Sequence, residues 1–379
     1  MKNLLPLVVA LTVLVIAHFS TATAQQPPSE QAPEPRTDLT SSEPEAARLA
    51  SAFSSKLSVP VTLSDGTRTL TQTRQQWGIR LDIERMLTGG KNDVAFKVDT
   101  AATTAAVEKV AGRFEQPAVD AKLYLSGGKL KIAPDVPGHT LDISATVEQL
   151  ARAVESDPAT QRLTVPYIDK PARITASYLK EINGQIASFT TQVGGNSSRL
   201  RNVKLATAAI DGTLLAPGET FSLDKVVGPR TRKRGYREAT VFVDAKEVEG
   251  IGGGVSQVTG TLFNAAALAG LAIKEVHPHS RPVSYLPLGR DATVARGLKD
   301  LKFVNNTNTP IYISYTLRNR SLQAVIYGRK VDGQKVSLTR QVRRRAPGHV
   351  KAQLYRTIRL DGIDRKERIL SHTYRWKPG

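Results

Sequence analysis

A glycine-rich turn that leads directly into a helix is the part of this sequence best suited to bind a ligand or support a reaction. The turn is Gly252-Gly253-Gly254, and the apolar pattern after it predicts a helix over 255–271. Glycine tolerates positive φ and lets the backbone approach another group closely. The unpaired N–H groups at a helix start carry partial positive charge, so we expect an anionic or hydroxyl-rich ligand there.

Ser256 is the candidate nucleophile because it lies at this predicted helix start. A serine hydroxyl ionises with difficulty and needs a general base, for which His277 and His279 are the candidates. Asp291 could orient such a histidine as the third member of a triad. Two other roles stay open, since the hydroxyl of Ser256 could cap the helix or contact a ligand without reacting.

The predicted helix carries a polar stripe formed by Gln257, Thr261 and Asn264, whose spacing places them on one side of the helix. Buried amides and hydroxyls are costly unless they are paired. These three side chains therefore either brace neighbouring loops or line a groove for the amides or hydroxyls of a ligand.

Four further residues could contribute to the site. His277 and His279 are close enough in sequence to share a zinc ion, but a third ligand is needed, and the chain has neither Cys nor an HExxH motif, so we expect no metal and no other cofactor. Arg290 either pairs with the adjacent Asp291 or binds ligand. Glu219 follows a Pro-Gly turn and either stabilises that turn or faces the site.

Several blocks of residues, in their order and spacing, make residues 180–330 resemble the VanW family. These blocks are Asn202, 217–222 (PGETFS), 227–228 (VG), 235–236 (GY), 252–265, 277–280 (HPHS), Tyr285, 289–294 (GRDATV) and 300–306 (DLKFVNN). Residues 58–168 resemble the peptidoglycan-binding domain that often precedes VanW domains.

The resemblance implies a cell-envelope protein that binds peptidoglycan or its stem peptides, in wall maintenance or the glycopeptide response. In many members the position of Ser256 is Cys, which with a downstream His and Asp would resemble a Cys-His-Asp hydrolase or transpeptidase. Serine also occurs there in part of the family, which weakens thiol catalysis as the general function of the family. The alternative to a binding protein is an amidase or transpeptidase-like enzyme that uses Ser256 with His279 or His277 and Asp291.

The elements that would position these residues follow from local patterns in the 180–330 domain. They are a helix over 200–210, a turn at Pro217-Gly218, strands over 241–248, 292–295 and 302–304, and a hairpin over 311–327 that turns at Asn319-Arg320. The helix over 255–271 is apolar around most of its circumference, so we expect it at the centre of the domain.

Residues 46–170 are predicted to form a smaller domain, which makes the whole chain α+β. Its expected elements are hairpins over 58–73 and 123–132, helices over 101–114 and 144–154, and a strand over 163–168. No cluster of His, Asp and Glu resembles a catalytic site, so a binding or spacer role is expected.

The N-terminal end has the layout of a secretory signal peptide over 1–24, because Lys2 precedes an apolar run that ends before Ala22-Thr23-Ala24. The run is short for a membrane span of about twenty residues, which favours cleavage over a retained anchor. We thus expect a secreted, periplasmic or cell-wall-associated protein with no stable membrane span. Residues 25–45, rich in Pro, Gln, Glu and Ser, predict a flexible linker.

The net charge of +19 is concentrated in a C-terminal extension over 331–379, which is predicted to be β-rich. From Arg329 to Gly379 there are 15 Lys and Arg against 4 Asp and Glu, a net +11. Outside the cytoplasm the partners of such a segment are anionic wall polymers, lipid headgroups or stem-peptide carboxylates, and we expect no nucleic acid. The extension is either a solvated basic face or the binding surface of a non-catalytic scaffold.

Overall fold

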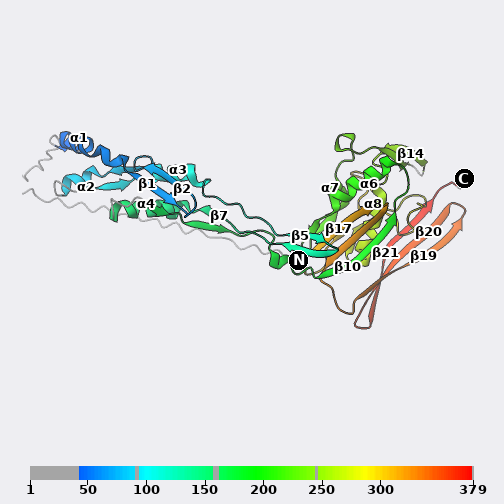
Figure 1. Ribbon diagram of the computed structural model, residues 1–379. Coiled ribbons are helices and arrows are strands. Elements are labelled where there is room, and N and C mark those ends of the chain that lie inside the picture. The colour runs from blue at the N-terminus through cyan, green and yellow to red at the C-terminus, as the bar shows by residue number, and fades with distance from the viewer. Residues whose placement is uncertain (1–41, 90–93, 157–161, 244–245, 378–379) are drawn as a thin grey trace, which may run out of the picture.

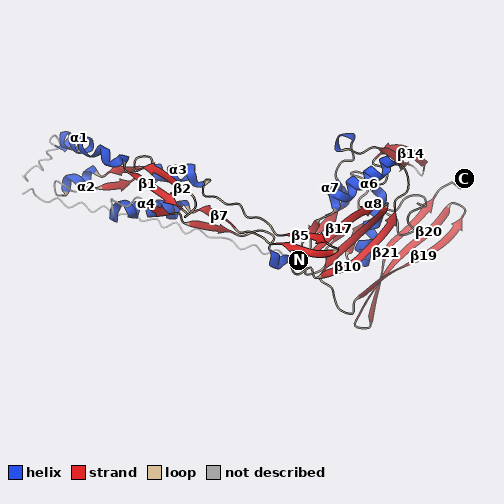
Figure 2. Cartoon of the chain, in the orientation of Figure 1, coloured by secondary structure: helices blue, strands red, loops and turns tan. Residues whose placement is uncertain are grey.

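The computed structural model describes residues 42–89, 94–156, 162–243 and 246–377. Two groups of elements lie at opposite ends of an elongated molecule (Figure 1). Both groups contain helices and strands (Figure 2), which confirms the predicted α+β class. The predicted signal peptide and most of the predicted linker lie outside the described residues, and from Ser42 the chain is helical rather than a linker.

The N-terminal group packs around Leu63, Trp77 and Phe114, whose side chains are almost fully buried. Its helices are α1 (Ser42–Phe53), the 3-10 helix η1 (Ser54–Ser58), α2 (Ile83–Thr88), α3 (Thr100–Ala111) and α4 (Ile143–Ser156). Its strands are β1 (Pro60–Ser64), β2 (Thr69–Thr73) and β8 (Arg162–Thr164), in the order β2-β1-β8, and the pair β3 (Ile79–Leu81) and β4 (Phe96–Val98).

Two strand pairs extend from this group towards the C-terminal group (Figure 1). They are β7 (Gly138–Leu141) with β9 (Tyr167–Lys170), and the hairpin of β5 (Lys122–Ser126) and β6 (Lys129–Ala133). Leu123 and Ile132 of this hairpin pack against Leu179 of α5 (Ala176–Leu179) and against Tyr312. The hairpin therefore shares a small core with residues of the C-terminal group.

The C-terminal group is centred on α8 (Val255–Leu268), in which Leu262 and Phe263 are fully buried. The helix ends before Gly270, whose φ of +80° stops it short of the predicted Leu271. Around it lie α6 (Ser197–Ile210) and a sheet of β10 (Gly184–Gln192), β18 (Ser321–Gly328), β17 (Ile311–Arg318) and β11 (Thr213–Leu215). A second sheet contains β12 (Thr220–Ser222), β16 (Lys302–Val304) and β15 (Ala272–Glu275), beside α7 (Leu223–Val227) and the 3-10 helix η2 (Arg232–Arg234).

The C-terminal extension forms a three-stranded antiparallel sheet that packs on this group. Its strands are β19 (Lys335–Ala346), β20 (His349–Leu360) and β21 (Ile363–Arg375), with β20 in the middle. Leu354 and Leu370 join the same hydrophobic core as α8. Arg356, which is only 4% exposed, donates to the carbonyl oxygens of Ala267 and Leu271 at 3.2 and 2.7 Å, beside the C-terminal end of α8. One face of the extension is thus part of the folded core.

The helices predicted over 101–114, 144–154 and 200–210 are confirmed, and so are the hairpins at 58–73, 123–132 and 311–327. The strand predicted over 163–168 is wrong, because Pro166 separates β8 from β9 and cannot donate a ladder hydrogen bond.

Two predicted strands of the C-terminal group are also wrong. The strand over 241–248 is the hairpin of β13 (Glu238–Val243) and β14 (Lys246–Ile251), since Val241 and Val248, at the two ends of the predicted strand, are cross-strand partners. Residues 292–295 make isolated bridges, of Thr293 with His277 and of Ala295 with Lys299, rather than a strand.

Candidate functional site

The glycine turn adopts the conformations that only glycine accepts readily. Gly252 and Gly254 have φ of +90° and +105°. A Cβ on Gly253 would lie 2.6 Å from the carbonyl oxygens of Ala239 and Thr240 in β13. The turn thus runs directly against the β13 backbone, which confirms the predicted close approach.

Asn202 of α6 fixes the turn from the other side. Its buried Nδ2 donates to the carbonyl oxygens of Gly253 and Arg237 at 3.0 and 2.9 Å, and its Oδ1 accepts from the Arg237 N–H at 2.8 Å. The side-chain amide therefore satisfies backbone groups of two segments that approach α8, and it holds both in place.

Ser256 lies in the first turn of α8 but does not cap the helix. The N-cap is Gly254, with no side-chain hydrogen bond, so the predicted capping role of Ser256 is wrong. Its half-buried hydroxyl lies 3.0 Å from the Thr293 hydroxyl. A pocket of about 290 Å³ opens over this helix start, and its lining includes Gly252, Gly253, Gly254, Ser256, Gln257, His279 and Thr293. The turn, the candidate nucleophile and one candidate base therefore share one pocket.

His279 is held by Asp291, as a triad requires of a base and its orienter. Both residues are buried, and Asp291 Oδ2 lies 2.9 Å from His279 Nδ1 and accepts from the His279 backbone N–H at 2.8 Å. The other carboxylate oxygen accepts from the hydroxyl of Tyr374 in β21. With a carboxylate as its partner, Nδ1 carries the proton in the neutral imidazole, which leaves Nε2 as the basic nitrogen.

The C-terminal sheet contributes two more bonds to this arrangement. The Tyr374 hydroxyl accepts from the Gly289 N–H at 2.7 Å, and His372 Nε2 lies 3.0 Å from the His279 carbonyl oxygen. Burial raises the pKa of Tyr374, and the Asp291 charge raises it further, so the phenol stays a neutral donor.

His277 does not line the pocket at Ser256. Its Nε2 lies 2.9 Å from Glu275 Oε1, while Glu275 Oε2 lies 2.8 Å from Lys302. Hydrogen bonds from Lys302 and His277 hold the pKa of Glu275 at about 2. In the described parts of the chain no group of three or more His, Asp or Glu side chains is arranged to hold a metal ion.

The side chains of the polar stripe on α8 form hydrogen bonds to neighbouring segments of the fold. Gln257 Nε2 donates to the Thr191 hydroxyl and the Gln192 carbonyl at 3.1 and 2.8 Å. The hydroxyl of Thr261, which is fully buried, lies 2.8 Å from that of Thr191 and donates to the Gln257 carbonyl. These contacts favour the bracing role for Thr261, whereas Gln257 also lines the pocket.

Asn264 and Arg290 bind each other rather than a ligand or an acid. Arg290 Nε donates to Asn264 Oδ1 at 2.6 Å, and Asn264 Nδ2 donates to the Arg290 carbonyl at 2.7 Å. The Arg290 guanidinium lies 4.8 Å from the centre of the Phe189 ring. The predicted ion pair of Arg290 with Asp291 is therefore wrong, because the Asp291 carboxylate is hydrogen-bonded to His279 and Tyr374.

Glu219 stabilises the turn in which it lies. Its Oε2 accepts from the Ala216 N–H at 2.9 Å, and its carbonyl accepts from the Asn305 N–H at 3.0 Å. It is exposed and lines neither the pocket at Ser256 nor the cleft beside it. The turn-stabilising alternative is the one the contacts support.

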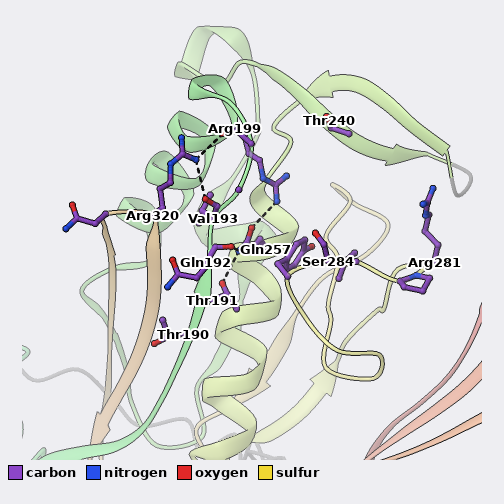
Figure 3. Close-up of a pocket in the computed structure, with 16 residues that line it drawn as sticks. Thr190, Thr191, Gln192, Val193, Arg199, Thr240, Gln257, Arg281, Ser284 and Arg320 are labelled. Carbon is purple, nitrogen blue, oxygen red and sulfur yellow. Dashed lines mark hydrogen bonds between the residues drawn. The ribbon is translucent and has the colours of Figure 1, made fainter.

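A larger cleft of about 1010 Å³ adjoins the pocket and shares Arg199, Thr240, Gln257 and Tyr285 with it. Figure 3 shows Arg199 over the start of α8, with its bond to Gln257 drawn, and Arg320 near Val193. The Arg199 guanidinium donates to Gln257 Oε1 at 3.0 Å and lies 5.8 Å from the centre of the Tyr285 ring. Sequence reasoning missed Arg199, although its place one turn before Asn202 on the same helix was a usable signal.

The pocket and the cleft are electropositive. Among the described residues that line them, the charged ones are Arg199, Arg230, Arg281, Lys299 and Arg320, and none is Asp or Glu. Arg230 is neutralised by Asp224, and Arg320 donates to the Val193 and Gly195 carbonyls. Arg199 is half-buried, and no carboxylate pairs with it in the described part of the structure. Burial lowers the pKa of Arg199 from the usual arginine range, and the guanidinium remains a cation.

Two family models match the chain. The one described as "VanW like protein" covers residues 198–327, and the one described as "Putative peptidoglycan binding domain" covers residues 68–162. No solved structure matches. Within the described residues, no helix is long and apolar enough to cross a membrane.

Two curated relatives resemble parts of the chain. The "Uncharacterized protein YoaR" of Bacillus subtilis (strain 168) is 36% identical over 194 residues, which are 51% of this chain and 64% of the relative. The "Vancomycin B-type resistance protein VanW" of Enterococcus faecalis (strain ATCC 700802 / V583) is 28% identical over 142 residues, 35% of this chain and 50% of the relative. The matched part of the chain thus spans less than two thirds of either relative.

Proposed function

Since this chain is a VanW-family protein with an N-terminal peptidoglycan-binding domain, we propose that the pocket at the start of α8 binds a carboxylate of a peptidoglycan stem peptide without reacting with it. The family matches support a cell-wall-associated protein. We further propose that it is secreted and that the N-terminal domain holds the C-terminal domain against the wall.

The single observation that carries the proposal is Arg199. A half-buried guanidinium without a carboxylate partner in the described part of the structure has donors left for an anion. It faces the pocket over a helix start, where a negative charge is also favoured by the helix dipole. The Tyr285 ring beside it provides an apolar face for the rest of a peptide.

The partner of Ser256 favours binding over catalysis. A serine nucleophile needs its hydroxyl within hydrogen-bond reach of a base. The Ser256 hydroxyl is paired with that of Thr293, and among the described residues it has no hydrogen bond to an imidazole. A hydroxyl pair at this position can instead donate to a bound carboxylate.

One observation favours a second candidate function, a peptidoglycan amidase or transpeptidase-like acyl transferase. His279 is oriented by the buried Asp291 and lines the same pocket as Ser256, so two of the three parts of a triad are in place. In this candidate, ligand binding would break the Ser256–Thr293 bond and bring the hydroxyl to His279.

The first experiment compares binding of a purified stem peptide with a free C-terminal carboxylate to binding of its C-terminally amidated form, by calorimetry. The variant is Arg199→Gln, and the matched control is Lys204→Gln, an exposed cation on the same helix. Loss of one charge-assisted hydrogen bond should weaken binding of the free acid by about tenfold or more. The control should bind as the wild type does, and amidation should cost the wild type more than it costs Arg199→Gln.

The second experiment digests purified peptidoglycan with wild type and with Ser256→Ala, and records both the bound protein and the released products. Binding without products, unchanged by the substitution, is the expected result. Products that disappear with Ser256→Ala would establish the enzyme instead. In the first experiment, equal affinity of the wild type for the free and the amidated peptide would refute carboxylate recognition by the pocket.

A further inference from the structure

The C-terminal sheet has two faces of opposite character. In β20 the side chains of Val350, Ala352 and Leu354 are buried, and Leu354 packs in the domain core. Side chains alternate along a strand, so Lys351, Gln353 and Tyr355 point away from the core. The strand therefore defines an inner and an outer face for the whole sheet.

The strand register extends the outer face to both neighbours of β20. On β19, Arg343 lies opposite Lys351 of β20, and Lys335 lies opposite Arg359 of β20. In β21 the residues opposite outer positions of β20 include Lys366, Arg368 and Arg375. We call the following set the outer basic face: Lys335, Arg343, Lys351, Arg359, Lys366, Arg368 and Arg375.

Little negative charge balances this face. Asp364 lies opposite Arg359 and binds it at 2.6 Å, which neutralises one cation. Glu367 occupies an inner position and pairs with the buried Arg356. Among the described residues, the remaining cations of the outer basic face make no ion pair.

This arrangement works against the stability of the sheet. Like charges directly opposite each other across a strand pair are unfavourable, and Arg343 faces Lys351 in this way. A single-sign surface instead creates a field that attracts oppositely charged partners. The charge pattern is thus better suited to an interaction than to folding.

The geometry points to a linear, hydrated polyanion as the partner. We propose that the outer basic face binds an anionic polymer of the cell envelope that carries negative groups at regular intervals. Neighbouring strands are about 4.8 Å apart and alternate residues of one strand about 6.7 Å apart, so the cations repeat over an extended area rather than surround one anion. The outer-face residues between these cations are polar, such as Thr339, Gln341 and Gln353. Membrane insertion requires large apolar side chains, and in the described strands of this sheet no large aliphatic side chain lies between the cations on this face.

The proposal is independent of stem-peptide binding, because the outer basic face lies on the side of the sheet away from α8. The two sites can therefore be tested separately. Arg199→Gln should leave polymer binding unchanged, whereas changes to the outer basic face should leave stem-peptide binding unchanged.

The test measures binding of the full chain to a purified polyol-phosphate polymer, to a polyuronate and to anionic phospholipid vesicles, over a series of salt concentrations. The variant combines Arg343→Gln, Lys351→Gln, Lys366→Gln and Arg368→Gln. The control combines Lys109→Gln, Lys122→Gln, Lys129→Gln and Lys131→Gln, which remove the same charge from exposed positions of the N-terminal group and the β5–β6 hairpin.

The outer-face variant should lose polymer affinity by about tenfold or more at low salt and show a shallower salt dependence, because fewer counterions are exchanged. The control should stay within about twofold of the wild type if position rather than net charge decides binding. The phosphate and uronate arms identify the anionic group. Equal weakening of variant and control, or binding to vesicles alone, would overturn the proposal. Matching unfolding midpoints of the outer-face variant and the control would show that a loss of folding does not cause their difference in polymer affinity.

Discussion

Ser256→Cys would measure the electric field at the start of α8 directly. The chain contains no Cys, so this substitution creates a single thiol whose titration can be followed without interference. The side chain is half-buried in the pocket that Arg199 and Lys299 also line. A thiolate is favoured by the same features that would favour a bound carboxylate, so the thiol reports on the proposed binding site.

The expected shift follows from the helix start and the two cations. A helix N-terminus favours a negative charge by about 0.3–1 kcal/mol, and up to about 2 kcal/mol in partly buried geometries. One pKa unit corresponds to about 1.4 kcal/mol, so the helix alone lowers a thiol pKa by about 0.2–0.7 unit, and by up to about 1.5 units in a partly buried geometry, from its ordinary value near 8.5. Arg199 and Lys299 act in the same direction, while partial burial opposes them. We expect the thiol of Ser256→Cys to titrate at about 7–8.

The assay is the rate of alkylation by iodoacetamide as a function of pH, at low and at high salt. The control is Ser51→Cys, an exposed position in the last turn of α1, where the helix dipole has the opposite sign. Its thiol should titrate at or above the ordinary value. A Ser256→Cys thiol that titrates at the same pH as the control would refute the claim that the pocket favours anions, and with it the proposed role of Arg199.

Three other predictions concern the stability of the C-terminal group. Tyr374→Phe removes the donor to Asp291 and leaves the Gly289 N–H unpaired, which should lower the free energy of unfolding by about 2–4 kcal/mol. The control Tyr355→Phe, on the outer face of the same sheet, should change the free energy of unfolding little. Equal urea midpoints of the two variants would contradict this prediction. Gly253→Ala places a Cβ against the β13 carbonyls and should destabilise by about 1–3 kcal/mol, while Gly194→Ala, where a Cβ meets nothing within 4 Å, is the control in the same thermal unfolding assay. The pKa of Glu275 is held at about 2, below its usual 4.5, so the stability from its ionised form is present above pH 4.5 and is lost as the pH falls towards 2. Glu275→Gln should therefore unfold more easily than wild type at pH 7, and a difference that does not shrink towards pH 2 would count against this ion pair.

The glycine turn and the central helix could be predicted because their signals are local. Three consecutive glycines and the apolar run after them set the backbone conformation within a few residues. The same holds for the hairpin at Asn319 and Arg320, which both adopt positive φ as its tight turn requires. The position of the pocket followed from these local features.

The partners within the site could not be predicted, because they come from distant segments. Arg199 reaches Gln257 from a different helix, and Tyr374 reaches Asp291 from the last strand of the chain. Residue type alone made Arg290 the natural partner of Asp291, but the fold gives that carboxylate a buried phenol and an imidazole instead. Periodicity indicates which side of an element is buried, and it carries no information on which side chain lies opposite.

The C-terminal extension shows why a count of charges does not describe a basic segment. Its cations divide into those that build the fold, such as Arg356 against the end of α8 and Arg340 on the Leu288 carbonyl, and those of the outer basic face. Truncation after Tyr327 would therefore remove Leu354, Leu370 and the Tyr374 hydroxyl together with the basic surface. Loss of polymer binding in such a truncated chain could reflect loss of the core, so only substitutions confined to the outer face separate recognition from folding.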